Sequence, residues 1–352
     1  MRDDHPLSPG LISSVAIAVA DDASAVGAAR RLGASLAAAA GLDAERSGQL
    51  ALIVTELGTN LVKHATRGML VLRALHATEG GGVEVLSLDR GPGMRNVAEC
   101  LRDGYSTGGT FGTGLGAVRR AAAVFDIVSD QRTGTAIVAR VAQRGAAPAV
   151  LYAGAVCVPQ PGESACGDAW GACVSGTQLR VALVDGLGHG PFAATASSAA
   201  LRAFYRHESE EPAAIVRHCH AALRTTRGAV MGLALLDRRT GQLSYAGVGN
   251  VAATLLEPQR RRGLASQNGI VGHHLPDLRV VDERLPVGAV LVLNSDGLST
   301  RWSLEAYPGL LNKHPALIAG VLYRDFSRDR DDSCVLVLCG PEHSAEADVS
   351  GA

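Results

Sequence analysis

Apolar residues recur at helical spacing in two consecutive segments near the start of the chain. An alanine-rich stretch over about 23–40 ends at Gly41, the residue type favoured just after a helix C-terminus. In the next segment, over about 45–64, one face is lined by Leu50, Ile53, Val54, Leu57 and Leu61. Alternating segments typical of strands lie at about 14–19, 69–77, 82–90, 126–129 and 135–142, and a third helix is expected over 115–123. This pattern predicts a mixed α/β domain over residues 1–142.

Strand-like segments dominate the second half of the chain. They are expected at about 151–158, 172–175, 178–184, 231–237, 242–248, 251–256, 290–294 and 334–339. Helical spacing occurs at about 191–207, 212–226, 305–313 and 314–323. Residues 143–149 are polar, then small, and include one proline, a composition typical of a linker. We therefore predict a second α+β domain over 150–341, a linker at 143–149 and a disordered polar tail at 342–352.

Composition excludes several classes of protein. Lys and Arg total 33 against 34 Asp and Glu, so there is no polybasic surface for nucleic acid. No apolar run reaches the roughly 18 residues of a membrane helix, and the N-terminus lacks the basic region of a signal peptide. The seven cysteines contain no CxxC pair, which favours reduced thiols. We expect a cytoplasmic protein that binds neither nucleic acid nor membrane.

A carboxylate, an amide and an ammonium share one face of the helix expected over 45–64. Glu56, Asn60 and Lys63 stand at positions i, i+4 and i+7, a spacing that brings side chains to one side of a helix. Such a face could hold a metal-bound polyphosphate. The same spacing also occurs on solvated helix surfaces, so this motif alone is weak.

Two glycine-containing segments follow this helix. Asp89 comes directly after an expected strand and precedes Gly91 and Gly93, so a hydrogen-bond acceptor stands beside two positions without side chains. The glycine-rich run Gly108–Gly116 ends where a helix is expected to begin. Free amides and the helix dipole favour anionic phosphates at such a point. Either segment alone is common as a turn.

The order of the three motifs is more specific than each motif alone. A helix with E-x-x-x-N-x-x-K, a strand followed by D-x-G-x-G, and a glycine-rich loop opening a helix resemble the GHKL ATPase fold. The stretches TELGTNLVKHA, DRGPGM and GTAIVARV are similar to the RsbT-like serine protein kinases of the anti-sigma and switch-kinase group. The resemblance covers about residues 14–142. It implies a GHKL (Bergerat) α/β sandwich that binds ATP with Mg²⁺ and phosphorylates serine or threonine.

The resemblance also implies roles for individual residues. Glu56 would be the general base that deprotonates the attacking hydroxyl, Asn60 would ligate Mg²⁺, and Asp89 would accept a hydrogen bond from the adenine amino group. Gly91 and Gly93 would let the base lie close, and the glycine-rich loop would wrap the triphosphate. The nucleotide-binding residues implied in this way are Asn60, Lys63, Asp89, Gly91, Gly93, Gly112, Gly114, Gly116 and Thr135. Phosphoryl transfer depends mostly on positioning and charge stabilisation, which these groups supply.

Isolated aspartates stand where apolar strands of the second half end, at Asp168, Asp185, Asp296 and Asp331–Asp332. Carboxylates that converge without a partner repel each other and raise one another's pKa. A hard divalent cation held by oxygen ligands resolves this conflict. Two such ions can lower the pKa of a shared water enough for phosphate-ester hydrolysis. A single Asp-Gly pair is weak evidence, because it is also a common turn.

The ordered set GD, VDGLGHG, GVGN, SDGL and DDS resembles the PP2C/SpoIIE-type (PPM) serine/threonine phosphatases over about 150–340, and the short RsbX-type members in particular. The resemblance implies a PP2C-like α-β-β-α sandwich with Mn²⁺ or Mg²⁺. Asp185 would bridge both ions and Gly186 would offer its carbonyl. Asp168 would hold one ion, directly or through water, and Asp296 and Asp331 the other, with Asp332 as the alternative to Asp331. The N-terminal phosphate-gripping arginine of eukaryotic PP2C enzymes has no match.

Together the two resemblances predict a bifunctional regulator of bacterial partner-switching or stress signalling. The kinase would phosphorylate Ser or Thr of a STAS-domain partner, as in a stressosome-like complex, and the phosphatase would remove such a phosphate. In one alternative, the first domain is an ATP-gated, anti-sigma-like binding module fused to an active phosphatase. In another, only the phosphatase is active and ATP occupancy regulates it. Glu56 favours the kinase, because binding alone needs no base.

Overall fold

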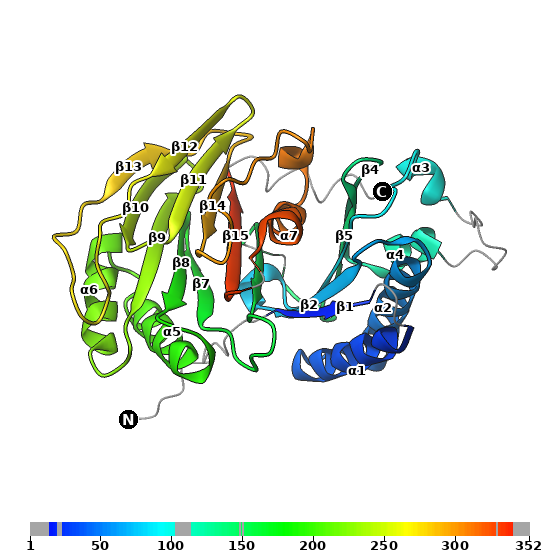
Figure 1. Cartoon of the computed structure of the whole chain (residues 1–352), viewed down its shortest axis with the longest axis horizontal. Coiled ribbons are helices and arrows are strands. Elements are labelled where there is room, and N and C mark those ends of the chain that lie inside the picture. Colours follow the sequence, from blue (N-terminus) through cyan, green and yellow to red (C-terminus); the bar gives the residue numbers. More distant parts are fainter. Residues whose placement is uncertain are drawn as a thin grey trace.

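Two sheet-containing halves share one helix between them, as Figure 1 shows. The computed structural model describes residues 14–19, 23–102, 114–147, 149, 151–328 and 330–340. Gly112 and the predicted tail at 342–352 lie outside the described residues. None of the helices in this described part of the chain is both long and apolar enough to cross a membrane.

The first half is an antiparallel sheet with helices on one face. Its strands in spatial order are β1 (Val15–Ala18), β2 (Met69–Leu75), β3 (Gly82–Asp89), β5 (Gly134–Val141) and β4 (Val124–Asp130). Its helices are α1 (Ala23–Ala39), α2 (Ala44–His64), α3 (Val97–Cys100) and α4 (Gly114–Ala121), with a 3-10 turn η1 (Ala77–Glu79). The apolar face predicted for α2 shares one core with Leu70 and Leu72 of β2 and Val83 and Val85 of β3. The predicted mixed α/β domain is confirmed.

The second half contains two five-stranded antiparallel sheets that pack face to face. The first contains β13 (Val281–Arg284), β10 (Gln242–Val248), β9 (Ala229–Asp237), β8 (Gln178–Gly186) and β7 (Asp168–Ser175). The second contains β12 (Arg260–Leu264), β11 (Ala252–Glu257), β14 (Val290–Asn294), β15 (Ser333–Cys339) and β6 (Ala153–Val158). Helices α5 (Gly190–Arg206) and α6 (Pro212–Leu223) cover the first sheet, and α7 (Pro315–Phe326) covers the second. The predicted α-β-β-α sandwich is confirmed.

One predicted helix of the second half is wrong. Residues 305–313 form turns and only a short 3-10 segment, η2 (Leu310–Asn312). Pro308 cannot donate a backbone hydrogen bond, and Gly309 adopts a left-handed φ of 80°, so the chain turns here instead of continuing a helix.

Helix α7 packs against both halves. On one side it covers β6 and β15, and on the other it covers the face of the first-half sheet that α1, α2 and α4 leave open. Contact is close at both surfaces. A Cβ added at Gly154 of β6 would lie 2.0 Å from the Ala316 amide nitrogen, and one at Gly320 of α7 would lie 3.0 Å from Leu88 Cδ2 of β3. The two halves therefore share a hydrophobic core.

Four buried charges also lie on the open face of the first-half sheet. The carboxylate of Glu84 binds Arg73 Nε and Arg140 Nε, each at 2.7 Å, and Glu79 forms two further hydrogen bonds with the guanidinium of Arg73. Arg140 also donates to the backbone oxygen of Ala153 in β6, at 3.3 Å. This network pairs every charge that the interface buries here, and it reaches across to the second half.

The described residues of the predicted linker, 143–147 and 149, form no helix or strand. They are nevertheless tied to the first half. The Gln143 side chain donates to the Ala40 carbonyl, and Arg144 Nε binds Asp43 Oδ2 at 2.8 Å. This segment turns beside the α1–α2 connection rather than spanning a gap between separate bodies.

Candidate functional sites

Three side chains on α2 are available to a ligand. Glu56 and Asn60 are half-buried and Lys63 is exposed, and none of the three has a hydrogen-bond or ion-pair partner among the described residues. Their helix is fixed by its N-cap, where Asp43 accepts from the Arg46 amide, and by its buried apolar face. A rigid helix thus presents a carboxylate, an amide and an ammonium on its unoccupied side.

The D-x-G-x-G loop lies against the C-terminal turn of this helix. Asp89 ends β3, and its Oδ1 accepts from the Gly91 amide at 2.6 Å. A Cβ at Gly91 would lie 2.9 Å from the His64 carbonyl oxygen, one residue beyond Lys63. Burial raises the pKa of Asp89. Across the sheet, Asp89 pairs with Thr135 of β5. The structure therefore brings Lys63, Asp89, Gly91 and Thr135 to one end of the domain.

The second glycine of the D-x-G-x-G loop is required by the packing of the protein itself. Gly93 has a left-handed φ of 60°, and a Cβ there would lie 2.2 Å from the Asp130 carbonyl oxygen at the β4–β5 turn. The loop must therefore approach protein backbone at this position, whatever lies on its other side. The remaining candidates, Gly114 and Gly116, are in the first turn of α4, which packs on α2.

Carboxylates from four strand ends gather at one edge of the second-half sandwich. Asp168 and Asp185 stand opposite each other on β7 and β8. Asp296 follows β14, and Asp331 comes shortly before β15, which pairs with β14. Burial, together with the negative charges of Asp296, Asp331 and Asp332, raises the pKa of Asp185 to about 8. All the predicted carboxylate ligands thus lie together.

The deepest of these carboxylates is Asp168. Its exposed fraction is 3%, and its Oδ2 accepts a hydrogen bond of 2.6 Å from the Ser295 hydroxyl. Burial and the charge of Asp185 raise the pKa of Asp168 well above its ordinary value. Burial and the charge of Asp331 do the same, to a smaller degree, for Asp296. Buried like charges without a cation are unfavourable, so this donor set fits divalent metal ions held by oxygen.

The two adjacent aspartates before β15 have different surroundings. Asp332 is buried, and its two oxygens accept from the backbone amides of Gln160 and Gly167, each at 2.7 Å. Asp331 is half-exposed and lies close enough to Asp296 for its charge to raise the pKa of that carboxyl. Asp332 thus holds the 160–167 loop, whereas Asp331 lies beside Asp296.

The predicted carbonyl donor, Gly186, lies where β8 meets α5. A Cβ there would lie 2.3 Å from the Ala193 carbonyl oxygen, so only glycine allows this close packing. A further side chain at this site, with no role expected from the sequence, is Asn250, whose Nδ2 donates to Asp296 Oδ2 at 2.8 Å. The available signal was its position two residues after the end of β10, in the GVGN motif.

A cation and an exposed aromatic ring lie beside the loop that follows Asp185. The guanidinium of Arg227 is 4.9 Å from the ring centroid of Phe192, whose exposed fraction is 68%. A Cβ added at Gly188 would lie 3.0 Å from Arg227 Nη1. Arg227 has no acidic partner among the described residues. It is a candidate for the phosphate-binding cation, for which the N-terminal sequence of this half offers no match.

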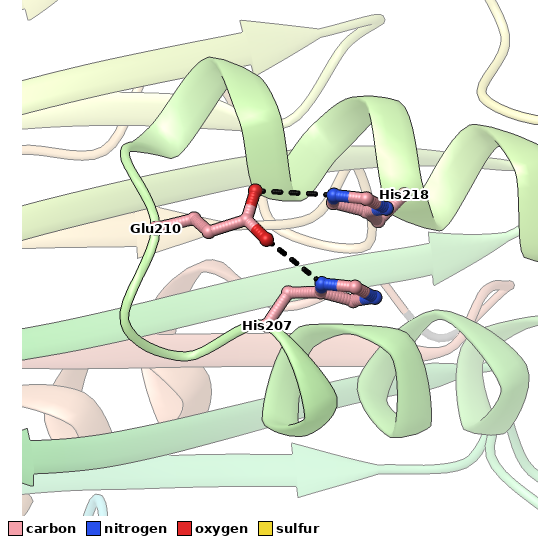
Figure 2. Close-up of side chains that lie close together, drawn as sticks. All are labelled: His207, Glu210 and His218. Carbon is pink, nitrogen blue, oxygen red and sulfur yellow. Dashed lines mark hydrogen bonds and ion pairs between the residues drawn. The ribbon is translucent and has the colours of Figure 1, made fainter.

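A third cluster lies apart from these two sites, where α5 turns into α6 (Figure 2). Glu210 binds His207 Nδ1 at 2.9 Å with one oxygen and His218 Nε2 at 3.1 Å with the other. The two imidazole rings are stacked, with centroids 3.5 Å apart and planes 2° apart. The nitrogen lone pairs of two stacked rings lie in parallel planes that do not meet, so they cannot both point at one metal ion. The cluster therefore acts as a hydrogen-bonded link between the helices.

Known families match both halves of the chain. A model of the histidine kinase-like ATPase domain matches residues 19–141, and a model of Stage II sporulation protein E (SpoIIE) matches residues 175–339. These matches confirm the two resemblances expected from the motifs.

Individual relatives agree with this division. Serine/threonine-protein kinase RsbT of Bacillus subtilis (strain 168) is 30% identical over 110 residues, 31% of this chain and 83% of that protein. Phosphoserine phosphatase RsbX of the same organism is 32% identical over 97 residues, 28% of this chain and 49% of that protein. The chain thus spans about half the length of RsbX. A solved structure described as "The bacterial stressosome: a modular system that has been adapted to control secondary messenger signaling" is 29% identical, covering 53% of this chain and 97% of that one, with a TM-score of 0.49.

Proposed function

Because the chain belongs through its first half to the histidine kinase-like ATPase family that includes RsbT, and carries a SpoIIE-type phosphatase domain in its second, we propose that it is a bifunctional enzyme. The first half transfers phosphate from ATP–Mg²⁺ to Ser or Thr of a protein partner. The second half removes such a phosphate with the help of divalent metal ions, Mn²⁺ or Mg²⁺. The enzyme acts in the cytoplasm.

The kinase assignment is supported by the α2 face. In this proposal Glu56 accepts the proton of the attacking hydroxyl, Asn60 holds Mg²⁺, and Lys63 contacts phosphate. All three side chains are without a protein partner among the described residues and stand on a rigid helix, as a reaction controlled by positioning requires. Asp89, with Thr135 opposite, would accept a hydrogen bond from the adenine, and Gly112, Gly114 and Gly116 are proposed to contact the phosphates.

The observation that carries the phosphatase assignment is the clustering of Asp168, Asp185, Asp296 and Asp331, in which burial and neighbouring negative charge raise the pKa of the first three. In this proposal Asp185 and the Gly186 carbonyl would help to hold both ions, Asp168 would hold one of them, and Asp296 and Asp331 would hold the other. Bound metal ions supply a water of lowered pKa for attack on the phosphate ester. Ser295 and Asn250 orient the carboxylates to which they donate.

The partner is proposed to be a STAS-domain protein of a stressosome-like complex. This proposal is supported by the similarity to RsbT and RsbX and by the stressosome context in which a similar structure is described. If one partner serves both sites, the ratio of the two activities sets its phosphorylation level.

A phosphate time course on a STAS-domain protein captured with the purified chain tests the proposal. ATP–Mg²⁺ is added first, then ATP is removed and Mn²⁺ supplied. Wild type is compared with Glu56→Ala and Asp185→Asn. We expect phosphate to appear only when Glu56 is present and to disappear only when Asp185 is present. If ATP binds but no phosphate appears in any sample, the first half is a nucleotide-gated binding module and the kinase assignment fails.

A further inference from the structure

One arginine of the phosphatase half contacts the backbone of two residues of the nucleotide site proposed for the kinase half. Arg324, in the last turn of α7, donates from Nη1 to the carbonyl oxygen of Asp89 at 2.6 Å and to that of Thr135 at 3.2 Å. Its side chain is only 3% exposed. These two carbonyls belong to paired residues of β3 and β5, so a single guanidinium joins the strand ends that carry the proposed adenine-binding side chains.

The guanidinium of Arg324 is held in place from behind. Asp325 accepts hydrogen bonds from Arg324 Nε and Nη2, the latter at 2.6 Å. Asp325 also accepts from Arg90 Nε at 2.8 Å and from the Tyr307 hydroxyl at 2.6 Å. Arg90 follows Asp89 directly, so Asp325 holds both the Arg324 guanidinium and the residue next to Asp89. Because its guanidinium is already held in one orientation, Arg324 loses little conformational entropy when it binds the two carbonyl oxygens.

The backbone at the ends of β3 and β5 has little freedom to rearrange if the contacts with Arg324 are lost. Gly134 has a left-handed φ of 81°, and a Cβ there would lie 2.2 Å from the Asp89 carbonyl oxygen. The Asp89 carboxylate is itself oriented by the Gly91 amide. A cation behind the backbone also favours the ionised carboxylate, the form that accepts hydrogen bonds without donating one.

We propose that Arg324 is a positioning residue of the nucleotide site, supplied by the phosphatase half, which holds Asp89 and Thr135 in the geometry that accepts adenine. This inference rests on the proposed function of the first half. Arg324 acts through the backbone of these two residues and is not itself a catalytic residue. ATP binding therefore requires α7 to be docked.

The same end of α7 also touches the metal site of the phosphatase. The Ser299 amide donates to the Phe326 carbonyl at 2.8 Å, and the Arg328 amide donates to the Gly297 carbonyl at 2.7 Å. Gly297 directly follows the proposed ligand Asp296. A shift of the helix end that accompanies nucleotide binding would therefore move the backbone beside a metal ligand. Coupling between two binding sites is reciprocal by thermodynamic necessity.

The test measures the affinity of a non-hydrolysable ATP analogue by calorimetry in the full chain. Arg324→Lys and Arg324→Gln are compared with Lys313→Ala, which removes a different ion pair across the same interface, 2.9 Å from Asp126. We expect each Arg324 variant to weaken binding about ten-fold and Lys313→Ala to leave it unchanged. Circular dichroism confirms that each variant is folded.

Inosine triphosphate separates positioning from general damage, because it lacks the amino group that Asp89 would accept from. Wild type should prefer the ATP analogue, and the Arg324 variants should lose that preference while binding inosine triphosphate nearly as wild type does. Unchanged ATP affinity and unchanged preference in both variants overturn the inference. A wild-type chain that binds neither nucleotide refutes the proposed kinase function itself, a distinct outcome.

Coupling is tested with adenosine, which carries no phosphate and needs no metal in the nucleotide site. We expect adenosine to shift the Mn²⁺ midpoint of p-nitrophenyl phosphate hydrolysis about five-fold in wild type and not in Arg324→Lys. A shift of equal size in the variant, or none in wild type, overturns the coupling.

Discussion

Replacing Glu84 with alanine tests whether the two halves unfold as one unit. Glu84 lies in β3 directly opposite both arginines with which it pairs, Arg73 on β2 and Arg140 on β5. The two bonds are 2.7 Å each, and the Glu84 side chain is 1% exposed. The substitution leaves the buried Arg140 with one long carboxylate contact, 3.9 Å to Glu79, and its hydrogen bond to the Ala153 carbonyl.

Two routes give the size of the effect. Removing one partner of a buried ion pair costs about 3–5 kcal/mol, because the other charge stays buried without compensation. Burial alone would raise the pKa of Glu84, but the charges of the two arginines outweigh it and lower the pKa from 4.5 to about 2, which is equivalent to roughly 3 kcal/mol of stability. Because the folded pKa is depressed, this stability is present above pH 4.5 and is lost as the pH falls toward 2. We expect the free energy of unfolding to fall by about 3 kcal/mol at pH 7.

The assay is urea unfolding at pH 7, followed by circular dichroism and by tryptophan fluorescence. Both tryptophans, Trp170 and Trp302, belong to the second half, whereas Glu84 belongs to the first. If α7 and the charge network unite the halves, Glu84→Ala shifts both transitions together. The control is Glu45→Ala, whose side chain is 62% exposed beside Arg144 and should cost less than about 1 kcal/mol. A fluorescence transition that stays in place while the dichroism transition splits would refute the reasoning.

Four further outcomes can be measured directly. In EDTA, the melting temperature should fall as the pH rises from 5 to 8. The pKa of Asp185 is raised from 3.8 to about 8 in the folded protein, so its contribution to stability is complete below pH 3.8 and is lost as the pH rises toward 8. Mn²⁺ should abolish this pH dependence, and a melting temperature that does not change with pH in EDTA contradicts the buried charge cluster. Gly93→Ala forces a Cβ to within 2.2 Å of the Asp130 carbonyl, and calorimetry should show weaker ATP binding with unchanged Mn²⁺-dependent phosphatase activity. Arg227→Ala should raise KM for a phosphopeptide several-fold while leaving the Mn²⁺ midpoint alone, and an unchanged KM removes Arg227 from the substrate site. Cleavage at a protease site inserted beside Gly145, where an added Cβ meets nothing within 4 Å, should leave both fragments together on size-exclusion chromatography.

Sequence pattern suffices where burial is one-sided. Apolar residues of α2 return every three or four positions because one face packs on the sheet and the other faces solvent. The acidic strand ends carry a similarly local signal, since Asp185 and Asp296 each end an apolar run. The family resemblances depend on these same local features, which is why both were available from sequence.

The sequence pattern does not predict an element whose two faces do not differ in burial. Strands β12 and β13 lie at sheet edges and are largely exposed, so they show no apolar alternation and were not predicted. The distinction between Asp331 and Asp332 is invisible for another reason. It depends on the amides of Gln160 and Gly167, which lie more than 160 residues away in sequence. Contacts of that range leave no periodic trace.

Helix α7, which packs against both halves, has one feature that the sequence pattern shows and one that it does not. Residues 315–322 of α7 are all buried, and a helix that is apolar all round must be covered on every side. One sheet can cover only one side of it. The second surface is the outer face of the first-half sheet, where Val71, Leu86 and Leu88 would otherwise be exposed. Each half therefore covers apolar surface that the other half would leave exposed. This packing, and not the segment at 143–149, holds the two halves together. It follows that the end of one shared helix lies next to both the proposed nucleotide site and the proposed metal site, and that the nucleotide site includes a contact from the second half.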